Sequence, residues 1–357
     1  MKIQRGDLEA AAAAGILQAD AVESLIAFLQ ARDRKSGVAR FNGTHVLYYL
    51  GGMMAIGSVS LFTTLAVEAL GMGALLGLSV LYMLAAFVAA GWFEKRGFGV
   101  PAGICAALSI ALTPLAIFAL QHLLGLWADT EGSQHYRDYH AVIDWRWLLM
   151  ELATLAVGAI MLWRFRYPFM VMPIAVTLWY MGMDIVPALI MQAVPDSFYG
   201  DAAWELRKQI TLAFGLVMLL VAFFVDLRSR HGKDFAFWLY LFGVMTFWGV
   251  LSSMGNGALN GKLVYLALNF GMVFVGAILG RRVFSVFGGI GIALVLGDLS
   301  WRIFKDSFAF VLILTLLGFA FIAAGIWWNK HEATISNGLR RYLPVHLREL
   351  LEARTGL

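Results

Sequence analysis

Long apolar stretches recur along this chain between residues 46 and 328. A helix needs about 20 apolar residues to cross the hydrocarbon core of a bilayer, because each residue adds about 1.5 Å of length. Only 14% of the 357 residues are charged, against roughly 25% in an average soluble domain. The composition therefore excludes an ordinary soluble enzyme, and the sequence predicts an all-α, polytopic bundle of transmembrane helices.

Charges and glycines interrupt the apolar stretches and divide them into about ten candidate spans. The first five are residues 46–67, 72–92, 100–124, 146–163 and 168–190, and the others are residues 209–225, 235–254, 262–280, 283–299 and 307–328. Two divisions depend on short interruptions, one after Val67 and one at Arg281–Arg282. Residues 46–328 are thus predicted to form the bundle, between a cytoplasmic segment (1–45) and a basic amphipathic tail helix (329–357).

The positions of Lys and Arg predict the orientation, because cytoplasmic loops of membrane proteins carry an excess of basic residues. With the N-terminus in the cytoplasm, 20 of the 27 basic residues fall inside and 7 outside. We therefore expect both termini on the cytoplasmic side of a bacterial inner membrane. The net charge of +4 reflects this topology and does not indicate a nucleic-acid partner.

The segment before the first span has the pattern of a helical hairpin. Gly15 fits the residue that ends a first helix, and Asp20 with Glu23 gives a capping-box pattern for a second helix. The tail has leucines at helical spacing, at Leu343, Leu347, Leu350 and Leu351. Hairpin and tail are predicted to contact anionic lipid or a cytoplasmic protein partner.

Polar residues within the spans are the candidates for chemistry, because an ionisable group in hydrocarbon is costly. Those predicted in the outer half of the bundle are Glu151, Asp184, Asn269 and Asp298, with Tyr180 one turn before Asp184. This placement predicts a polar cavity, open to the outside, that binds a small solute or a cation or relays protons.

A structural interpretation of the same acids stands beside this one. Asp298 lies four residues before Arg302, so the two can pair on one helix face. Glu151 and Asp184 can instead reach the membrane interface.

Three prolines, Pro114, Pro173 and Pro187, lie inside predicted spans. Proline in a helix interior frees a backbone carbonyl and kinks the helix. Kinks are common in helix bundles, and they also form the polar cavities of transporters.

No recognisable motif indicates catalysis, a metal or a cofactor. Nucleophile-elbow, P-loop and zincin patterns are absent from the sequence. The outer loop over residues 125–145 is rich in acids and histidines, but their spacing matches no rigid metal-binding template. We therefore expect a protein that is not an enzyme and holds neither metal nor cofactor.

Several segments resemble a bacterial family of uncharacterised inner-membrane proteins with a domain of unknown function. They are the GIL-x-x-x-A step of residues 15–21, GGMMAIGSVSLF in the first span, GRRVFSVFGGIGIALVLGD, FKDSFAFVLILTLLGFAFIAAGIWW and the tail motif YLP-x-x-LR. The resemblance covers most of the chain and is looser in the middle. It implies localisation and architecture, and it implies no catalytic residue.

Three function classes follow from these observations. The preferred hypothesis is a secondary transporter, or permease-like protein, with its site at the buried polar residues. The alternative is a non-transporting membrane scaffold or sensor that acts on a cytoplasmic partner through the N-terminal hairpin and the C-terminal helix. A membrane enzyme acting on lipid is disfavoured by the lack of a catalytic motif.

Overall fold

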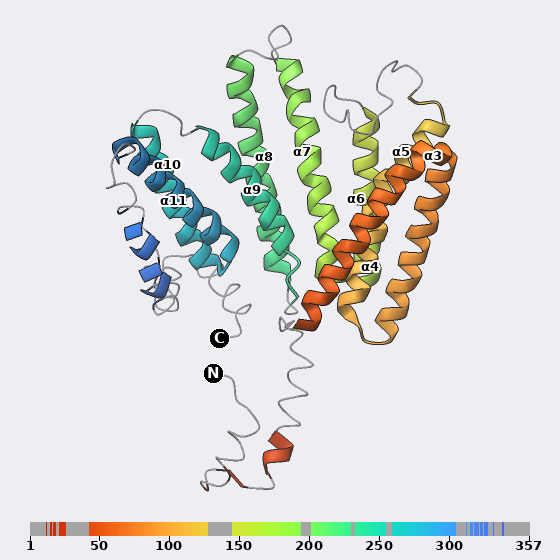
Figure 1. The fold of residues 1–357 in the computed structure, drawn as a ribbon, viewed down its shortest axis with the longest axis horizontal. Helices are drawn as coiled ribbons and strands as arrows, with labels where there is room; N and C mark the ends of the chain where they lie inside the picture. The colour runs from red at the N-terminus through yellow and green to blue at the C-terminus, as the bar shows by residue number, and fades with distance from the viewer. Residues whose placement is uncertain are drawn as a thin grey trace.

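The computed structural model describes residues 43–127, 145–193, 201–229, 233–254 and 259–304, with scattered residues near both ends of the chain. Its elements are α3 (Gly43–Lys95), α4 (Gly99–Ala111), α5 (Thr113–Leu123), α6 (Trp145–Phe165), η1 (Pro168–Met170), α7 (Val171–Ala193), α8 (Asp201–Arg228), α9 (Phe237–Met254), α10 (Leu259–Leu279) and α11 (Arg282–Phe304). Every element in these described ranges is a helix (Figure 1). The predicted all-α fold is confirmed for this part of the chain.

Seven described helical segments are long and apolar enough to cross a membrane. They are Gly71–Lys95, Gly99–Leu123, Trp145–Phe165, Trp204–Arg228, Phe237–Met254, Asn260–Leu279 and Arg282–Arg302. Each coincides with one predicted span. Of the other predicted spans, residues 46–67 lie in the first part of α3, residues 168–190 form η1 and most of α7, and residues 307–328 lie largely outside the described residues.

A sharp break at Gly71 divides α3 into two helices. Gly71 has φ 78° and ψ 176°, a conformation that is open almost only to glycine. Figure 1 shows the two parts of α3 running in opposite directions. The predicted division after Val67 is thus confirmed, a few residues further along the chain.

The prolines act differently from one another. Next to Pro114 the helix is interrupted, since α4 ends at Ala111 and α5 begins at Thr113. Pro173 lies in the first turn of α7, directly after η1. The kink predicted within a span at Pro173 is therefore corrected to a helix start, where the missing N–H of proline costs little. The helix α7 continues through Pro187.

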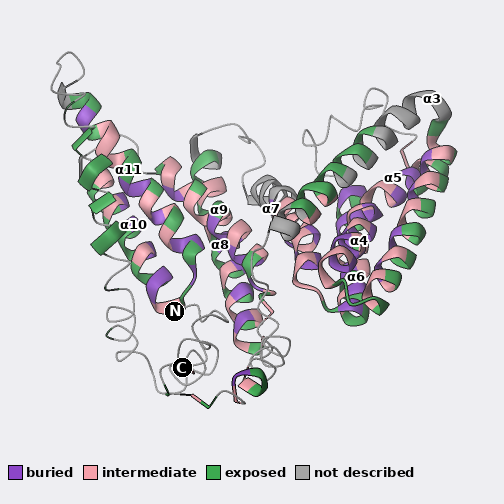
Figure 2. Ribbon diagram, turned by 60° about the horizontal axis from the view of Figure 1, so that its bottom comes forward, coloured by how far each residue is buried: buried purple, intermediate pink, exposed green. Residues whose placement is uncertain are grey.

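The buried apolar residues form three clusters that define two groups of helices, α3 to α6 and α7 to α11. The two groups are in direct contact through α6 and α7. One cluster joins α3, α4 and α6 around Ile110 and Met161, and a second joins α3, α5 and α6 around Leu75 and Phe118. The third joins α7 to α11 around Tyr240. In Figure 2 the buried residues line the contacts between helices, while many outward-facing residues are exposed. Exposed apolar side chains of this kind suit a lipid environment.

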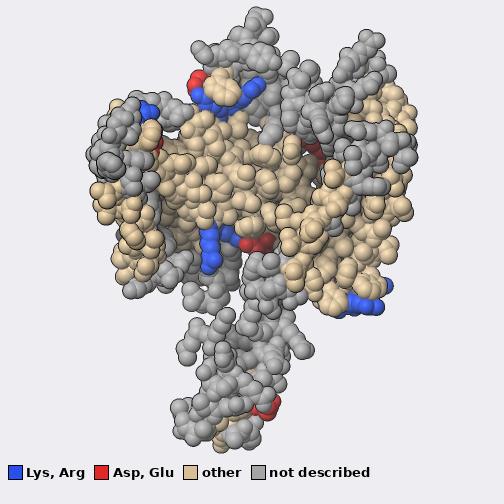
Figure 3. Space-filling model, viewed as in Figure 1, with Lys and Arg blue, Asp and Glu red and all other residues tan. Residues whose placement is uncertain are grey.

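Charged residues gather at the two ends of the helices. The turns after α3, α6, α8 and α10 lie at the same end, the lower one in Figure 1. Ionic and polar contacts join them, with Arg164 paired to Glu94 at 3.1 Å and Lys233 Nζ donating to the carbonyl of Arg166 at 3.3 Å. On the face drawn in Figure 3, an uncharged belt separates the charges at the upper and lower edges. These are the turns whose basic residues the sequence assigns to one side of the membrane.

The predicted terminal segments, residues 1–45 and 329–357, lie mostly outside the described residues. Gly15 is described, and it has φ 69° with its N–H donating to the carbonyl of Ala12 at 3.0 Å. This is the left-handed conformation expected of a residue that ends a helix.

Candidate functional site

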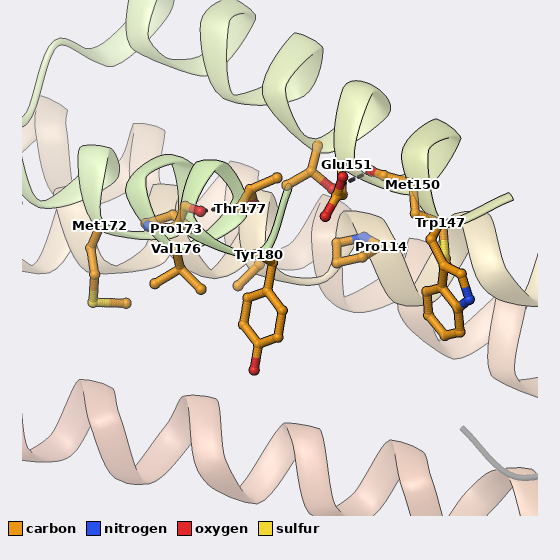
Figure 4. A pocket seen from close by; sticks show the side chains of 11 residues that line it. Pro114, Trp147, Met150, Glu151, Met172, Pro173, Val176, Thr177 and Tyr180 are labelled. Atoms are coloured by element: carbon orange, nitrogen blue, oxygen red, sulfur yellow. Dashed lines mark hydrogen bonds between the residues drawn. The ribbon is translucent and has the colours of Figure 1, made fainter. Parts of the chain in front are cut away.

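A cavity of about 450 Å³ lies where the two groups of helices meet, between α5, α6 and α7 (Figure 4). Its volume falls in the range of small-molecule sites, roughly 300–1,000 Å³. The cavity is lined by Ala111 and Pro114, by Trp147, Met150, Glu151 and Thr154 of α6, and by Met172, Pro173, Val176, Thr177 and Tyr180 of α7. Both Pro114 and Pro173, which the sequence singles out, are in this lining.

Helical periodicity brings these side chains to one face of each helix. On α6 the lining residues recur at intervals of three and four, from Trp147 through Met150 and Glu151 to Thr154. Leu152, which directly follows Glu151, lies on another face of the helix and is 50% exposed. The cavity-lining residues of α6 and its exposed apolar residues therefore lie on different faces of the helix.

Glu151 is the only charged side chain in the described lining, and it is buried, with 4% of its surface exposed. It lies in the second turn of α6, about 9 Å from the first residue of the helix at about 1.5 Å per residue. Figure 4 shows its carboxylate and the Tyr180 ring projecting toward the same side of the α6–α7 pair. A buried acidic side chain in the wall of a cavity, between helices long and apolar enough to cross a membrane, is a candidate contact for a solute or an ion.

Two threonines add oxygen acceptors to the lining. Thr154 donates its hydroxyl hydrogen to the carbonyl of Met150 at 2.7 Å, and Thr177 donates to the carbonyl of Pro173 at 2.9 Å. A hydroxyl has one hydrogen and two lone pairs. Because each hydrogen is used within its own helix, these oxygens can only accept hydrogen bonds from the cavity.

The cavity wall near the start of α6 packs against an aromatic cluster. Trp147 packs edge-on against Trp127, with ring centroids 5.5 Å apart, and the guanidinium of Arg146 lies 5.0 Å from the Trp127 ring. Gln121 donates to the carbonyl of Arg146 at 3.1 Å and accepts from Trp127 Nε1 at 3.2 Å. These contacts fix the start of α6, and with it the position of Glu151, against α5.

The structure brings together two of the five residues that the sequence predicts to form one site. Glu151 and Tyr180 line the cavity together. Asp184 lies further along α7, and its side chain is outside the part that the structure describes. Asn269 and Asp298 are not in the cavity lining.

Asn269 joins three helices of the second group. It is fully buried on α10, accepts from Trp248 Nε1 of α9 at 3.0 Å, and donates to the carbonyl of Tyr265 at 2.8 Å. Gly291 of α11 lies so close that a Cβ atom there would stand 1.9 Å from Asn269 Oδ1. Asn269 is therefore an interhelical contact with its hydrogen-bonding groups engaged.

Asp298 forms ion pairs near one end of α11. It pairs with Lys262 of α10 and accepts from Arg302 Nε at 3.2 Å, one turn away on its own helix. The structural interpretation, in which Asp298 pairs with Arg302, describes this arrangement, and Lys262 adds a contact between helices.

A buried ionic network joins the helices α8 to α11 at the end away from Asp298. The sequence analysis does not anticipate this network. Arg281, in the turn before α11, donates from Nε to Asp226 Oδ2 at 3.0 Å and from Nη2 to the other oxygen, and it pairs with Asp234. Tyr240 donates to Asp226 at 3.3 Å. Burial lowers the pKa of Arg281, but hydrogen bonds with Asp226 and Asp234 outweigh it and leave the pKa above its usual value.

In the sequence, these charges appear only as members of basic and acidic loops. The signal that could have identified them is the position of Asp226, which falls at the end of an apolar run, next to the predicted cytoplasmic boundary. An acid at that depth requires a partner.

Within the described residues, no group of three or more His, Cys, Asp and Glu side chains could hold a metal ion. Comparisons with models of protein families, with curated proteins and with solved structures find no match for this chain.

Proposed function

We propose that this chain is an integral membrane transport protein, permease-like rather than enzymatic, whose solute site is the α5–α6–α7 cavity. The observation that carries the proposal is the carboxylate of Glu151, 4% exposed, in the wall of a cavity of about 450 Å³ between helices able to cross a membrane. A buried acid in such a position is costly for stability, and in membrane proteins it marks pathways for solutes and ions.

The location of the cavity supports the same proposal. It lies between α5 and α6 of one packed group and α7 of the other. Transporters place their sites between two helix groups, because relative movement of the groups can then open the site to either side. Pro114 and Pro173 lie in this lining, in the first turns of α5 and α7.

The proposed protein has about ten spans and both termini in the cytoplasm, in a bacterial inner membrane. The four turns of α3, α6, α8 and α10 at one end of the bundle carry Lys95 and Arg96, Arg164 and Arg166, Arg228 and Lys233, and Arg281 and Arg282. Basic residues gathered at one end favour that end as the cytoplasmic one.

Accessibility of the cavity from the two sides of the membrane tests the proposal. The chain has one cysteine, Cys105, so Val176→Cys in a Cys105→Ala background places a single thiol in the lining. Alternating access predicts that a membrane-impermeant thiol reagent labels Val176→Cys in right-side-out vesicles and also in inverted vesicles. The matched control is Leu152→Cys, on the exposed face of α6, which we expect to be labelled from neither side.

Labelling of Val176→Cys from one side only, or from neither, contradicts transport. The alternative of a membrane scaffold, acting through residues 1–45 and 329–357, predicts the last result and depends on segments mostly outside the described residues.

A further inference from the structure

We propose that the α5–α6–α7 cavity binds a small hydrophobic amine in its protonated form, with Glu151 as the counter-charge. This inference rests on the proposed function in taking the cavity as the solute site, and it names the chemical class of the solute.

The charge of the lining favours a cation. Glu151 is its one charged side chain, and the described lining includes no Lys, Arg or His. A carboxylate forms strong, charge-assisted hydrogen bonds with the N–H groups of a cationic ligand. An anionic solute would instead be repelled by the carboxylate.

The hydrogen-bonding groups favour a cation that carries N–H donors. The hydroxyl oxygens of Thr154 and Thr177 can only accept from the cavity, since their hydrogens are bonded to Met150 and Pro173 carbonyls at 2.7 and 2.9 Å. Together with the Glu151 carboxylate they present oxygens to a ligand. A primary ammonium group supplies three donors and requires such acceptors.

The remaining surface favours an apolar body over an inorganic ion. Trp147 and Tyr180 contribute aromatic rings to the lining, and ammonium groups are attracted to such rings. Met150, Met172 and Val176 complete an apolar wall, and methionine adapts to ligands of different shape. A metal cation such as Ca²⁺ requires about six to eight oxygen ligands around one point, and this donor set does not provide them.

Binding of three probes of one shape tests the inference on the purified full-length protein in nanodiscs, by isothermal titration calorimetry. Phenethylamine is positively charged at neutral pH, 2-phenylethanol is its neutral counterpart, and phenethyltrimethylammonium keeps the charge without N–H donors. We expect phenethylamine to bind most tightly of the three, and the alcohol most weakly.

Two substitutions connect this preference to the lining. Glu151→Gln should weaken phenethylamine binding by about tenfold or more, because it removes the charged partner. Thr154→Val should weaken binding of phenethylamine but leave binding of phenethyltrimethylammonium unchanged. Because this variant retains Glu151, it tests the inference even where Glu151→Gln does not fold. The matched control is Thr246→Val on α9, which removes a hydroxyl bonded in the same way, to Phe242 at 2.8 Å, outside the cavity lining.

Three results would each overturn the inference: no binding of phenethylamine, equal affinities for the amine and the alcohol, or equal effects of Thr154→Val and Thr246→Val. Failure of the transport proposal is distinguishable from these. Selective amine binding with labelling of Val176→Cys from one side only supports the site and rejects transport. Labelling of Val176→Cys from both sides, together with equal affinities for the amine and the alcohol, supports transport and rejects the amine site.

Discussion

Arg281 and Asp226, 55 residues apart in sequence, form a two-pronged ion pair that connects the α10–α11 turn to the end of α8. Both side chains are buried, at 8% and 4% exposure. The parallel N–H groups of the guanidinium match the two carboxylate oxygens, and Tyr240 adds a hydrogen bond to Asp226. The pair therefore fixes how α8, α9 and α11 meet at this end of the bundle.

Removing the Arg281 side chain should strongly destabilise the fold. Arg281→Met leaves Asp226 buried without its counter-charge, and breaking a buried pair in this way costs about 3–5 kcal/mol in the free energy of unfolding. Reversible unfolding in mixed detergent micelles measures the loss. The neighbouring Arg282 is exposed, so Arg282→Met is the control and should have little effect. The double variant Arg281→Met, Asp226→Leu should recover most of the lost stability. Equal losses of stability in Arg281→Met and Arg282→Met would contradict a role for the pair.

The fold was predictable from the sequence wherever a local signal determines it. Apolar run length locates the seven helices that are long and apolar enough to cross a membrane, and the glycine and proline breaks near Gly71 and Pro114 show where helices end. The Arg281–Asp226 pair was not predictable, because the partners lie far apart in sequence and each is an ordinary loop charge by itself.

The sequence indicates how far along its helix each candidate site residue lies, but not which neighbouring helix its side chain faces. Sequence position shows how far Glu151, Asn269 and Asp298 lie from a helix end, and it places all three in the same half of the predicted bundle. It does not show which neighbouring helix each faces, and α10 and α11 turn their polar residues toward each other and α9. The contribution of Thr154 was missed, because a threonine in an apolar helix gives no signal until its hydrogen-bond partner is known.

The close approach of Gly291 to Asn269 predicts that two glycines on α11 differ sharply in tolerance. A Cβ atom at Gly291 would lie 1.9 Å from Asn269 Oδ1, whereas one at Gly289 would have no neighbour within 4 Å. Gly291→Ala should therefore cost about 1–3 kcal/mol through overpacking. Gly289→Ala should be neutral or stabilise by up to about 1 kcal/mol through helix propensity. The same unfolding measurement compares the two variants, and equal stabilities would show that α10 and α11 do not pack this closely.

Arg166, between α6 and η1, has φ 51°, a left-handed conformation that costs a residue with a Cβ atom about 1–2 kcal/mol. Arg166→Gly should relieve most of this strain and raise the free energy of unfolding by about 1 kcal/mol. The carbonyl that accepts from Lys233 is retained. Arg166→Ala removes the same guanidinium but keeps the Cβ atom, so it should bring no gain. A gain in both variants would assign the effect to the lost charge and not to the backbone.

A comparison of Asp298 with Glu151 tests whether these two acids belong to different sites. Its contacts are ionic, with Lys262 and Arg302, and it is not in the cavity lining. Asp298→Asn should therefore weaken the contact between α10 and α11 slightly, as expected for a half-exposed pair, and leave the affinity for phenethylamine unchanged. Glu151→Gln, a substitution of the same chemical type on α6, should reduce that affinity. Calorimetry measures the affinity of both variants for phenethylamine. Because salt screens exposed ion pairs, the effect of Asp298→Asn on stability should also diminish at high ionic strength. An equal loss of affinity in both variants would place Asp298 and Glu151 in one site and overturn their separation.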